Sequence, residues 1–185
     1  MDVENVLRIL KQAKKSIQEN DPYSLKQLSN QTIHSASTKQ DKNSISVAVT
    51  IYSLGKIYER KDYKSMNGWN DFNKIIHSAL ERSIKYLENN DLENYQKNFE
   101  LIGKAINKIS GKLKKYIEEV FEKARINKAS RIYEHGVSLG KTATLLGVSL
   151  YDLASYTGST GISEVSYNQT LNTKQRIKIA EEIFE

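Results

Sequence analysis

A single proline, Pro22, interrupts the chain of 185 residues. Proline removes a backbone donor and clashes with the preceding helical turn, so its scarcity leaves long stretches free to form helices. Apolar residues recur every three or four positions through most of the chain, and this is the spacing of one face of a helix. The sequence therefore predicts an all-α fold.

The helices can be placed from this spacing and from local start and stop signals. Asp21 followed by Pro22 is typical of a capped helix start. The segment 44–60 is apolar on most sides; its β-branched residues would allow a strand, but its length and spacing favour a central buried helix. Gly103 and Gly111 predict a break or kink in the fifth stretch. The expected helices span 3–19, 22–38, 44–60, 66–89, 92–124 and 173–184, besides those of the segment treated below.

Cysteine usage and hydropathy bound the setting of the protein. The chain has no cysteine, which excludes disulfides, thiolate-ligated metals and thiol catalysis, and fits a reducing, cytoplasmic compartment. The first residues lack the basic start and apolar core of a signal peptide. The most apolar stretch, 45–54, is interrupted by serine and threonine and is too short to span a bilayer. We expect a soluble cytoplasmic protein with no membrane contact, and no pattern indicates a metal or a cofactor.

The net charge of +6 is concentrated in one stretch, from Gly103 to Arg131. Its basic residues are Lys104, Lys108, Lys112, Lys114, Lys115, Lys123, Arg125, Lys128 and Arg131, and its acidic residues are Glu118, Glu119 and Glu122. One interpretation is an electrostatic footprint for a polyanion. The other is a solvated, lysine-rich helix face.

The most informative segment runs from Asn127 to Thr157 and predicts a helix-turn-helix. Its signals are, in chain order, Gly136 ending one helix, Ser138 capping a second helix over 139–146, Gly147 forming the turn, Ser149 with Asp152 capping a third helix, and Gly158 ending it. Its expected core residues are Ile132, Leu139, Ala143, Leu146, Val148, Leu153 and Tyr156. Small and branched residues of this kind allow two short helices to cross steeply around a tight turn.

A resemblance to known proteins rests on the same residues. The run from Ser138 to Ser149, SLGKTATLLGVS, followed by Gly161 and Ile162, resembles the C-terminal module of small prokaryotic helix-turn-helix proteins of the antitoxin type. The whole chain also resembles an uncharacterised archaeal family with a helical N-terminal region. The resemblance implies DNA binding as a transcriptional regulator or antitoxin-type repressor.

The candidate DNA contacts follow from this motif. Ser149, Tyr151 and Ser155 are expected on the exposed face of the third helix, where Tyr151 and Ser155 can reach bases or phosphates. Lys128, Arg131 and Lys141 are expected to bind the phosphate backbone. The third helix contains no arginine or lysine, the residues that most often recognise guanine. The alternative is therefore a non-catalytic module that uses the helix-turn-helix to bind a protein partner.

The three histidines, His34, His77 and His135, form no metal-type pair in the sequence. Asn30 and His34 faintly resemble the Arg-Asn-x-x-x-His motif of HEPN-type ribonucleases, but Ser29 occupies the position of the arginine that would stabilise phosphate charge. Arg131 and His135 are spaced too closely for the same motif. A degenerate ribonuclease is thus a distant third interpretation, and no catalytic residue is assigned.

These observations predict an N-terminal helical bundle over residues 1–122 and a helix-turn-helix domain with a C-terminal helix over 123–185. The expected partner is DNA, with a protein partner as the alternative. A homodimer is expected because proteins of this kind read two half-sites.

Overall fold

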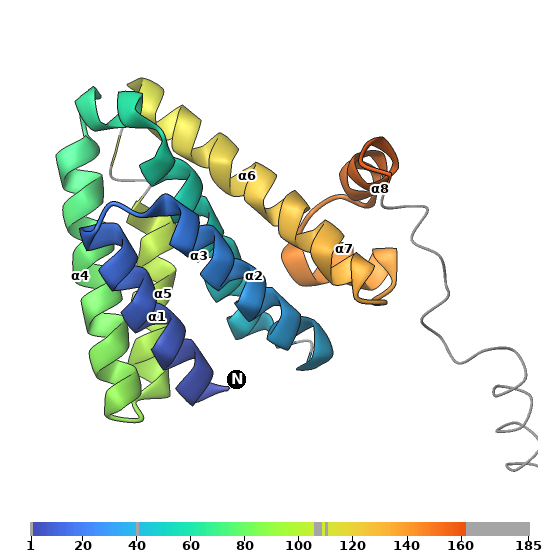
Figure 1. Ribbon diagram of the computed structural model, residues 1–185, viewed down its shortest axis with the longest axis horizontal. Helices are drawn as coiled ribbons and strands as arrows, with labels where there is room; N and C mark the ends of the chain where they lie inside the picture. Colours follow the sequence, from blue (N-terminus) through green and yellow to red (C-terminus); the bar gives the residue numbers. More distant parts are fainter. Residues whose placement is uncertain (1, 40, 106–108, 110, 162–185) are drawn as a thin grey trace, which may run out of the picture.

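The described chain is helical throughout, as the sequence predicted. The computed structural model describes residues 2–39, 41–105, 109 and 111–161. Within them lie α1 (Val3–Gln18), α2 (Pro22–Lys39), α3 (Lys42–Glu59), the 3₁₀ helix η1 (Lys61–Ser65), α4 (Trp69–Glu88), α5 (Leu92–Ala105), α6 (Gly111–Glu134), α7 (Leu139–Leu146) and α8 (Leu150–Ser159) (Figure 1). This part of the chain contains no strand, and none of its helices has the length and apolar character needed to cross a membrane.

The N-terminal helices begin where the sequence signals place them. Asp21 caps α2, since its carboxylate accepts a hydrogen bond of 3.0 Å from the backbone N–H of Ser24, and Pro22 is the first helical residue. Asp41 caps α3 in the same way. The apolar segment that follows is a helix and not a strand, and residues on nearly all of its sides are buried. The central buried helix predicted over 44–60 is thus confirmed.

The stretch predicted over 92–124 is described as two helices, since α5 ends at Ala105 and α6 begins at Gly111. Of the two glycines that predicted a break or kink, Gly111 is the first residue of α6, whereas Gly103 lies within α5. From Gly111, α6 runs unbroken for 24 residues, and the expected domain boundary between residues 122 and 123 falls inside it. The helix expected over 173–184 lies outside the described residues.

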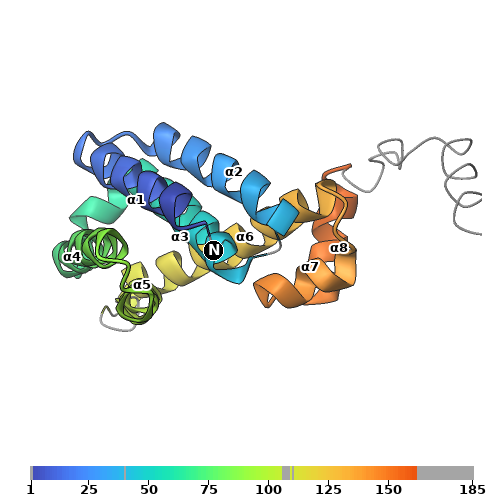
Figure 2. The ribbon, with the colours of Figure 1, turned by 90° about the horizontal axis from the view of Figure 1, so that it is seen from below.

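Two hydrophobic clusters fill the interior, and α6 belongs to both. The first cluster contains residues from every helix between α1 and α5 and from the N-terminal half of α6, among them Leu10, Leu54, Phe72 and Ile117. The second joins α2, α3, the C-terminal half of α6, α7 and α8, and it contains Ile33, Ala36, Ile45, Ala48, Val49, Ala124, Ala129, Ile132, Val137, Ala143, Leu146 and Leu153. Figures 1 and 2 show α6 running from the N-terminal helices to α7 and α8. The C-terminal helices therefore share their core with α2 and α3.

The connection from α6 through α7 to α8 follows the predicted local signals. Gly136 has a φ of +88° and Gly147 a φ of +63°, both in the left-handed region that favours glycine. Ser138 caps α7, and Ser149 caps α8 by accepting a hydrogen bond of 3.0 Å from the backbone N–H of Asp152. These local predictions are confirmed, except that α8 continues through Gly158 to Ser159.

We predict that Gly147→Val destabilises the protein by about 1 kcal/mol or more, because a β-branched residue is strained at positive φ. No atom lies within 4 Å of a Cβ built at this position, so the cost is conformational and not a steric clash with a neighbour. Urea unfolding followed by circular dichroism measures it.

Two further variants test this explanation. Gly147→Asn costs less, because asparagine tolerates the left-handed region. Gly140→Ala, at a helical glycine that is equally free of close neighbours, leaves stability unchanged or slightly raised. Equal losses for valine and asparagine at position 147 would contradict the conformational explanation.

Candidate functional site

The outer face of α8 is the most exposed part of the predicted DNA-binding segment. Tyr151 is 80% exposed and Leu150 54% exposed, and Ser149 and Ser155 also face solvent. On the opposite side of the helix, Leu153 is fully buried. The positions that the sequence predicted to be exposed on this helix are therefore exposed in the structure. The face contains no arginine or lysine.

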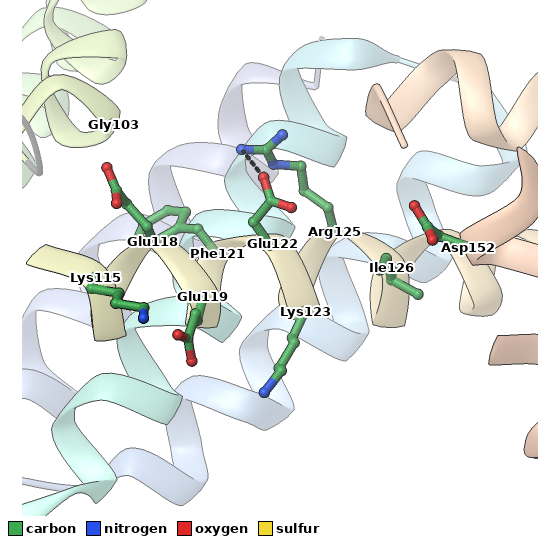
Figure 3. A pocket seen from close by; sticks show the side chains of 10 residues that line it. All are labelled: Gly103, Lys115, Glu118, Glu119, Phe121, Glu122, Lys123, Arg125, Ile126 and Asp152. Atoms are coloured by element: carbon green, nitrogen blue, oxygen red, sulfur yellow. Dashed lines mark ion pairs between the residues drawn. The ribbon is translucent and has the colours of Figure 1, made fainter. Parts of the chain in front are cut away.

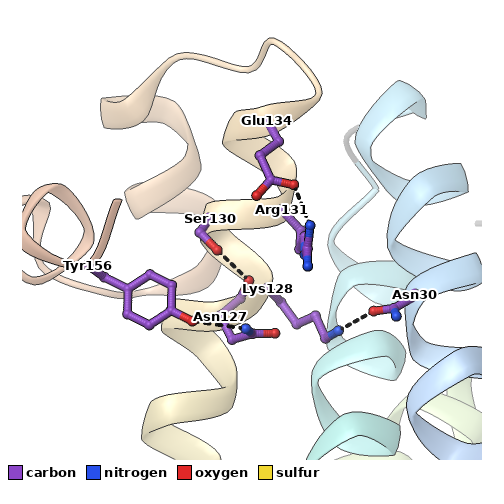
Figure 4. Close-up of polar contacts among 7 residues, drawn as sticks. All are labelled: Asn30, Asn127, Lys128, Ser130, Arg131, Glu134 and Tyr156. Atoms are coloured by element: carbon purple, nitrogen blue, oxygen red, sulfur yellow. Dashed lines mark hydrogen bonds and ion pairs between the residues drawn. The ribbon is translucent and has the colours of Figure 1, made fainter. Parts of the chain in front are cut away.

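Contacts with α6 fix the orientation of α8. The Asn127 side-chain amide donates a hydrogen bond of 3.1 Å to the hydroxyl of Tyr156, which points back from α8 as the sequence predicted (Figure 4). Leu153 joins the same cluster as Ile132 of α6 and Ala143 of α7. With its inner face held at these points, α8 presents its other face to solvent.

Of the three predicted phosphate contacts, Lys141 is the most accessible. It is exposed on α7, in the first turn after the Ser138 cap. Arg131 is also exposed, but its guanidinium forms an ion pair of 2.8 Å with Glu134 on the same helix. Both side chains have access to a ligand in solvent, although Arg131 would have to exchange or share its carboxylate.

Lys128, the third of these residues, lies inside the protein. Its side chain is 0% exposed, and its ammonium donates a hydrogen bond of 2.8 Å to Oδ1 of Asn30 on α2 (Figure 4). The same ammonium lies 4.1 Å from the centroid of the Tyr52 ring on α3, a distance typical of a cation–π contact. In this position Lys128 cannot touch a phosphate in solvent, so it holds α6 against α2 and α3.

Burial and charge act together on this lysine. Burial, with a smaller effect from the charge of Arg131, lowers the pKa of Lys128 from its ordinary value of 10.5 to about 8. Among the described residues, no carboxylate forms an ion pair with it. Asn30 and the face of Tyr52 are its polar contacts, and neither carries a negative charge.

The two histidines from the separate local motifs meet between α2 and the end of α6. The rings of His34 on α2 and His135 at the end of α6 are in edge-to-face contact, with centroids 4.9 Å apart. Asn30 precedes His34 by one helical turn, and Lys128, Arg131 and His135 follow one another along one side of α6. We call Asn30, His34, Lys128, Arg131 and His135 the junction cluster. Sequence spacing places the first two residues on one helix and the other three along another. Only the packing of α2 against α6 brings the two groups together.

The electrostatic surroundings of His135 disfavour its protonation. Burial lowers its pKa most, the neighbouring His34 and Arg131 lower it further, and Glu134 opposes them. Ser29, at the position where a HEPN-type motif has arginine, is buried and donates a hydrogen bond of 2.6 Å to the carbonyl of Ala48. The lysine and the arginine of the junction cluster therefore belong to α6, and the motif on α2 contributes no arginine.

A hollow of about 820 Å³ lies along α6, between Gly103 of α5 and Asp152 of α8, on a surface of mixed charge (Figure 3). It is lined by Gly103, Lys115, Glu118, Glu119, Phe121, Glu122, Lys123, Arg125, Ile126 and Asp152. Several cations of the predicted basic stretch are paired with acids, as Arg125 is with Glu122 at 3.9 Å and Lys114 with Glu118 at 3.9 Å. In this part of α6, cationic and acidic side chains therefore lie side by side on the helix surface and partly neutralise each other.

Comparison with known proteins assigns no family. The chain matches no protein-family model, no curated protein and no solved structure. Within the described ranges, no group of three or more histidine, cysteine, aspartate or glutamate side chains is arranged to hold a metal ion. The function is therefore argued from the placement of individual side chains.

We predict that Lys128 makes the stability of the protein depend on pH in the alkaline range. Its pKa of about 8 in the folded state is below the ordinary 10.5, so the unfolded chain binds more protons between these values. The free energy of unfolding therefore rises with pH across this interval, by up to about 3 kcal/mol from this group. Urea unfolding at a series of pH values measures the rise.

The variant Lys128→Met isolates this contribution, because the remaining groups titrate in both chains. It fills a similar volume without a charge, so it should be at least as stable as the wild type at pH 7 and lack the alkaline rise. Lys123→Met, at an exposed lysine of the same helix, is the matched control and retains the rise. Identical pH profiles for wild type and Lys128→Met would contradict a depressed pKa.

Proposed function

We propose that the protein is a nucleic-acid-binding regulator that uses α7 and α8 as a helix-turn-helix, with α8 as the recognition helix. The observation that carries the proposal is the orientation of α8. Its N-terminus is capped by Ser149 directly after the Gly147 turn, its inner face is buried against α6 and α7, and its outer face is open to solvent. A helix held in this way can enter the major groove of DNA with its first turns leading.

The proposed contacts are assigned from exposure. Tyr151 and Ser155 are the candidates for contacts with base edges, while Ser149 and Lys141 are candidates for contacts with the phosphate backbone. Arg131 remains a candidate phosphate contact through its exposed guanidinium. Lys128 is not assigned to DNA, because it is buried. Since α8 has no cation, one copy would bind with modest specificity, and a homodimer reading two half-sites would raise it.

A second candidate function rests on the composition of the same face. Leu150 and Tyr151 are large, exposed and adjacent. The helix α8 also carries an acidic residue, Asp152, where a DNA-recognition helix usually carries a basic residue. Exposed tyrosine and leucine surrounded by small polar residues are also suited to binding a protein partner. In that case the outer face of α8 would be a protein–protein interface and not a DNA interface.

We predict that the purified protein binds duplex DNA with an affinity that falls steeply with salt, because each phosphate contact releases counterions. Lys141→Ala should weaken binding to all sequences and reduce the slope of log K against log salt by about 1. Tyr151→Ala should instead change the preference among sequences. Fluorescence anisotropy with a random-sequence and a selected duplex measures both effects.

Tyr23→Ala provides the matched control. Tyr23 is 67% exposed on α2, so its removal alters a surface tyrosine without touching α8. It should leave the affinity and the sequence preference unchanged. If the wild type has no measurable DNA affinity at low salt, the DNA proposal fails, and the outer face of α8 is then to be tested as a protein interface.

A further inference from the structure

The junction cluster places cations together with little opposing negative charge. Lys128 is a buried ammonium whose hydrogen-bond acceptor, Asn30, is neutral. Burying a charge is costly unless an opposite charge compensates it, and methionine or leucine would fill the same space without that cost. A lysine in such a position is therefore a candidate for a functional group whose positive charge is used.

The groups around Lys128 add to its charge. Arg131 is close enough to both Lys128 and His135 to lower the pKa of each. Glu134 pairs with Arg131 at 2.8 Å and also acts on His135, whose pKa it raises, so it offsets one of the two positive charges present at pH 7. The cluster retains an excess positive charge even when both histidines are neutral.

The remaining charged neighbours do not remove this excess. From α3, Tyr52 contributes a neutral ring, and its pKa is raised mainly by burial. Glu59 of α3 is engaged by two lysines, Lys26 at 2.6 Å and Lys56 at 3.7 Å. From α8, Tyr156 is neutral and binds Asn127. The helices packed around the cluster thus bring in aromatic and neutral polar groups and no further unengaged carboxylate among the described residues.

The exposed edge of the cluster consists of His34, Arg131 and His135. Imidazole rings with centroids 4.9 Å apart repel each other when both are protonated, so neither proton is favoured without a compensating anion. An anion bound across the two rings and the guanidinium would relieve that repulsion. Arginine and protonated histidine donate charge-assisted hydrogen bonds, and phosphate oxygens accept them well.

We infer that the exposed edge of the junction cluster is a binding site for a phosphate group, contacted by His34, His135 and Arg131. Lys128, about two helical turns before His135 on α6, is the buried cation of the same cluster. The site lies apart from the outer face of α8, and Arg131 is the one residue that it shares with the contacts assigned under the proposed function. The phosphate group belongs either to a free phosphate or mononucleotide, or to a nucleic-acid backbone. Because binding and protonation of an imidazole are linked, phosphate binds more tightly as the pH falls.

The test is an NMR titration of the imidazole C–H resonances of the full chain between pH 5 and 8. The three histidines are assigned with His34→Gln, His77→Gln and His135→Gln. Inorganic phosphate is added in one series and sodium chloride of equal ionic strength in another. Phosphate should shift the imidazole resonances of His34 and His135 saturably, with an affinity about tenfold higher at pH 5 than at pH 8, because a protonated imidazole donates a charge-assisted hydrogen bond to phosphate. His77, on α4, should not respond.

Two further arms identify the source of the phosphate and the role of the arginine. A short oligonucleotide replaces inorganic phosphate in a third series. A response in the oligonucleotide series alone indicates a nucleic-acid backbone. A response in the oligonucleotide series and in the inorganic-phosphate series indicates a free phosphate or nucleotide. Arg131→Ala should weaken binding about tenfold, the loss expected for one charge-assisted hydrogen bond. Unchanged titrations of His34 and His135 with both probes, or an equal response of His77, would overturn the inference. Neither outcome depends on Tyr151 or Lys141, so failure of the phosphate site can be distinguished from failure of the DNA-binding proposal for α8.

Discussion

The packing of α6 against α2 and α3 is the contact on which the rest of the structure depends. One half of α6 supplies Leu113 and Ile117 to the cluster of the N-terminal helices, and the other half supplies Ala129 and Ile132 to the cluster that also holds α7 and α8. The helices α7 and α8 are short, and isolated helices of such length are marginal in water. Their stability therefore comes from burial against α6, and α6 in turn is positioned by α2 and α3. A loss of that contact would release the C-terminal helices together with their exposed face.

Lys128 lies within this contact. Its burial means that part of the positive charge of the chain is inside the protein and not at its surface. The sequence places it in a run of basic residues, where a solvated or DNA-facing side chain was expected. The structure directs it inward to Asn30 and Tyr52, while other cations of the same helix pair with glutamates, as Lys114 does with Glu118 and Arg125 with Glu122. Net charge is thus a poor guide to the interface here, since one cation is buried and others are neutralised locally. At the end of α6, Arg131 is paired with Glu134, and the histidine pair lies beside it.

The parts of the fold that were predictable are those determined by local chemistry. The helix start at Asp21, the left-handed glycines at 136 and 147, and the cap at Ser149 follow from a few neighbouring residues, and each is where the sequence indicated. The third helix begins two residues earlier than predicted, at Lys42, because Asp41 caps it. The exposed face of α8 was predictable for the same reason, because helical periodicity determines which side chains share a face. The meeting of His34 with His135 and of Asn30 with Lys128 was not predictable, because it depends on which helices pack together across the chain. Local patterns contain no information about that pairing, so residues that seemed to belong to two weak, separate motifs form one cluster.

The geometry of α6 also relates the two proposed sites to each other. Asn127 and Lys128 are adjacent in sequence, yet they leave the helix on different sides: Asn127 binds Tyr156 of α8, and Lys128 binds Asn30 of α2 (Figure 4). Successive residues of an α-helix point about 100° apart, so one turn of α6 can hold both partners at once. A ligand that draws Arg131 toward α2 therefore acts about one turn away from Asn127, which orients α8. Coupling between the sites requires that this turn have two arrangements, each favoured by one ligand. A rigid turn would instead leave the two sites independent, each serving its own ligand from a shared scaffold.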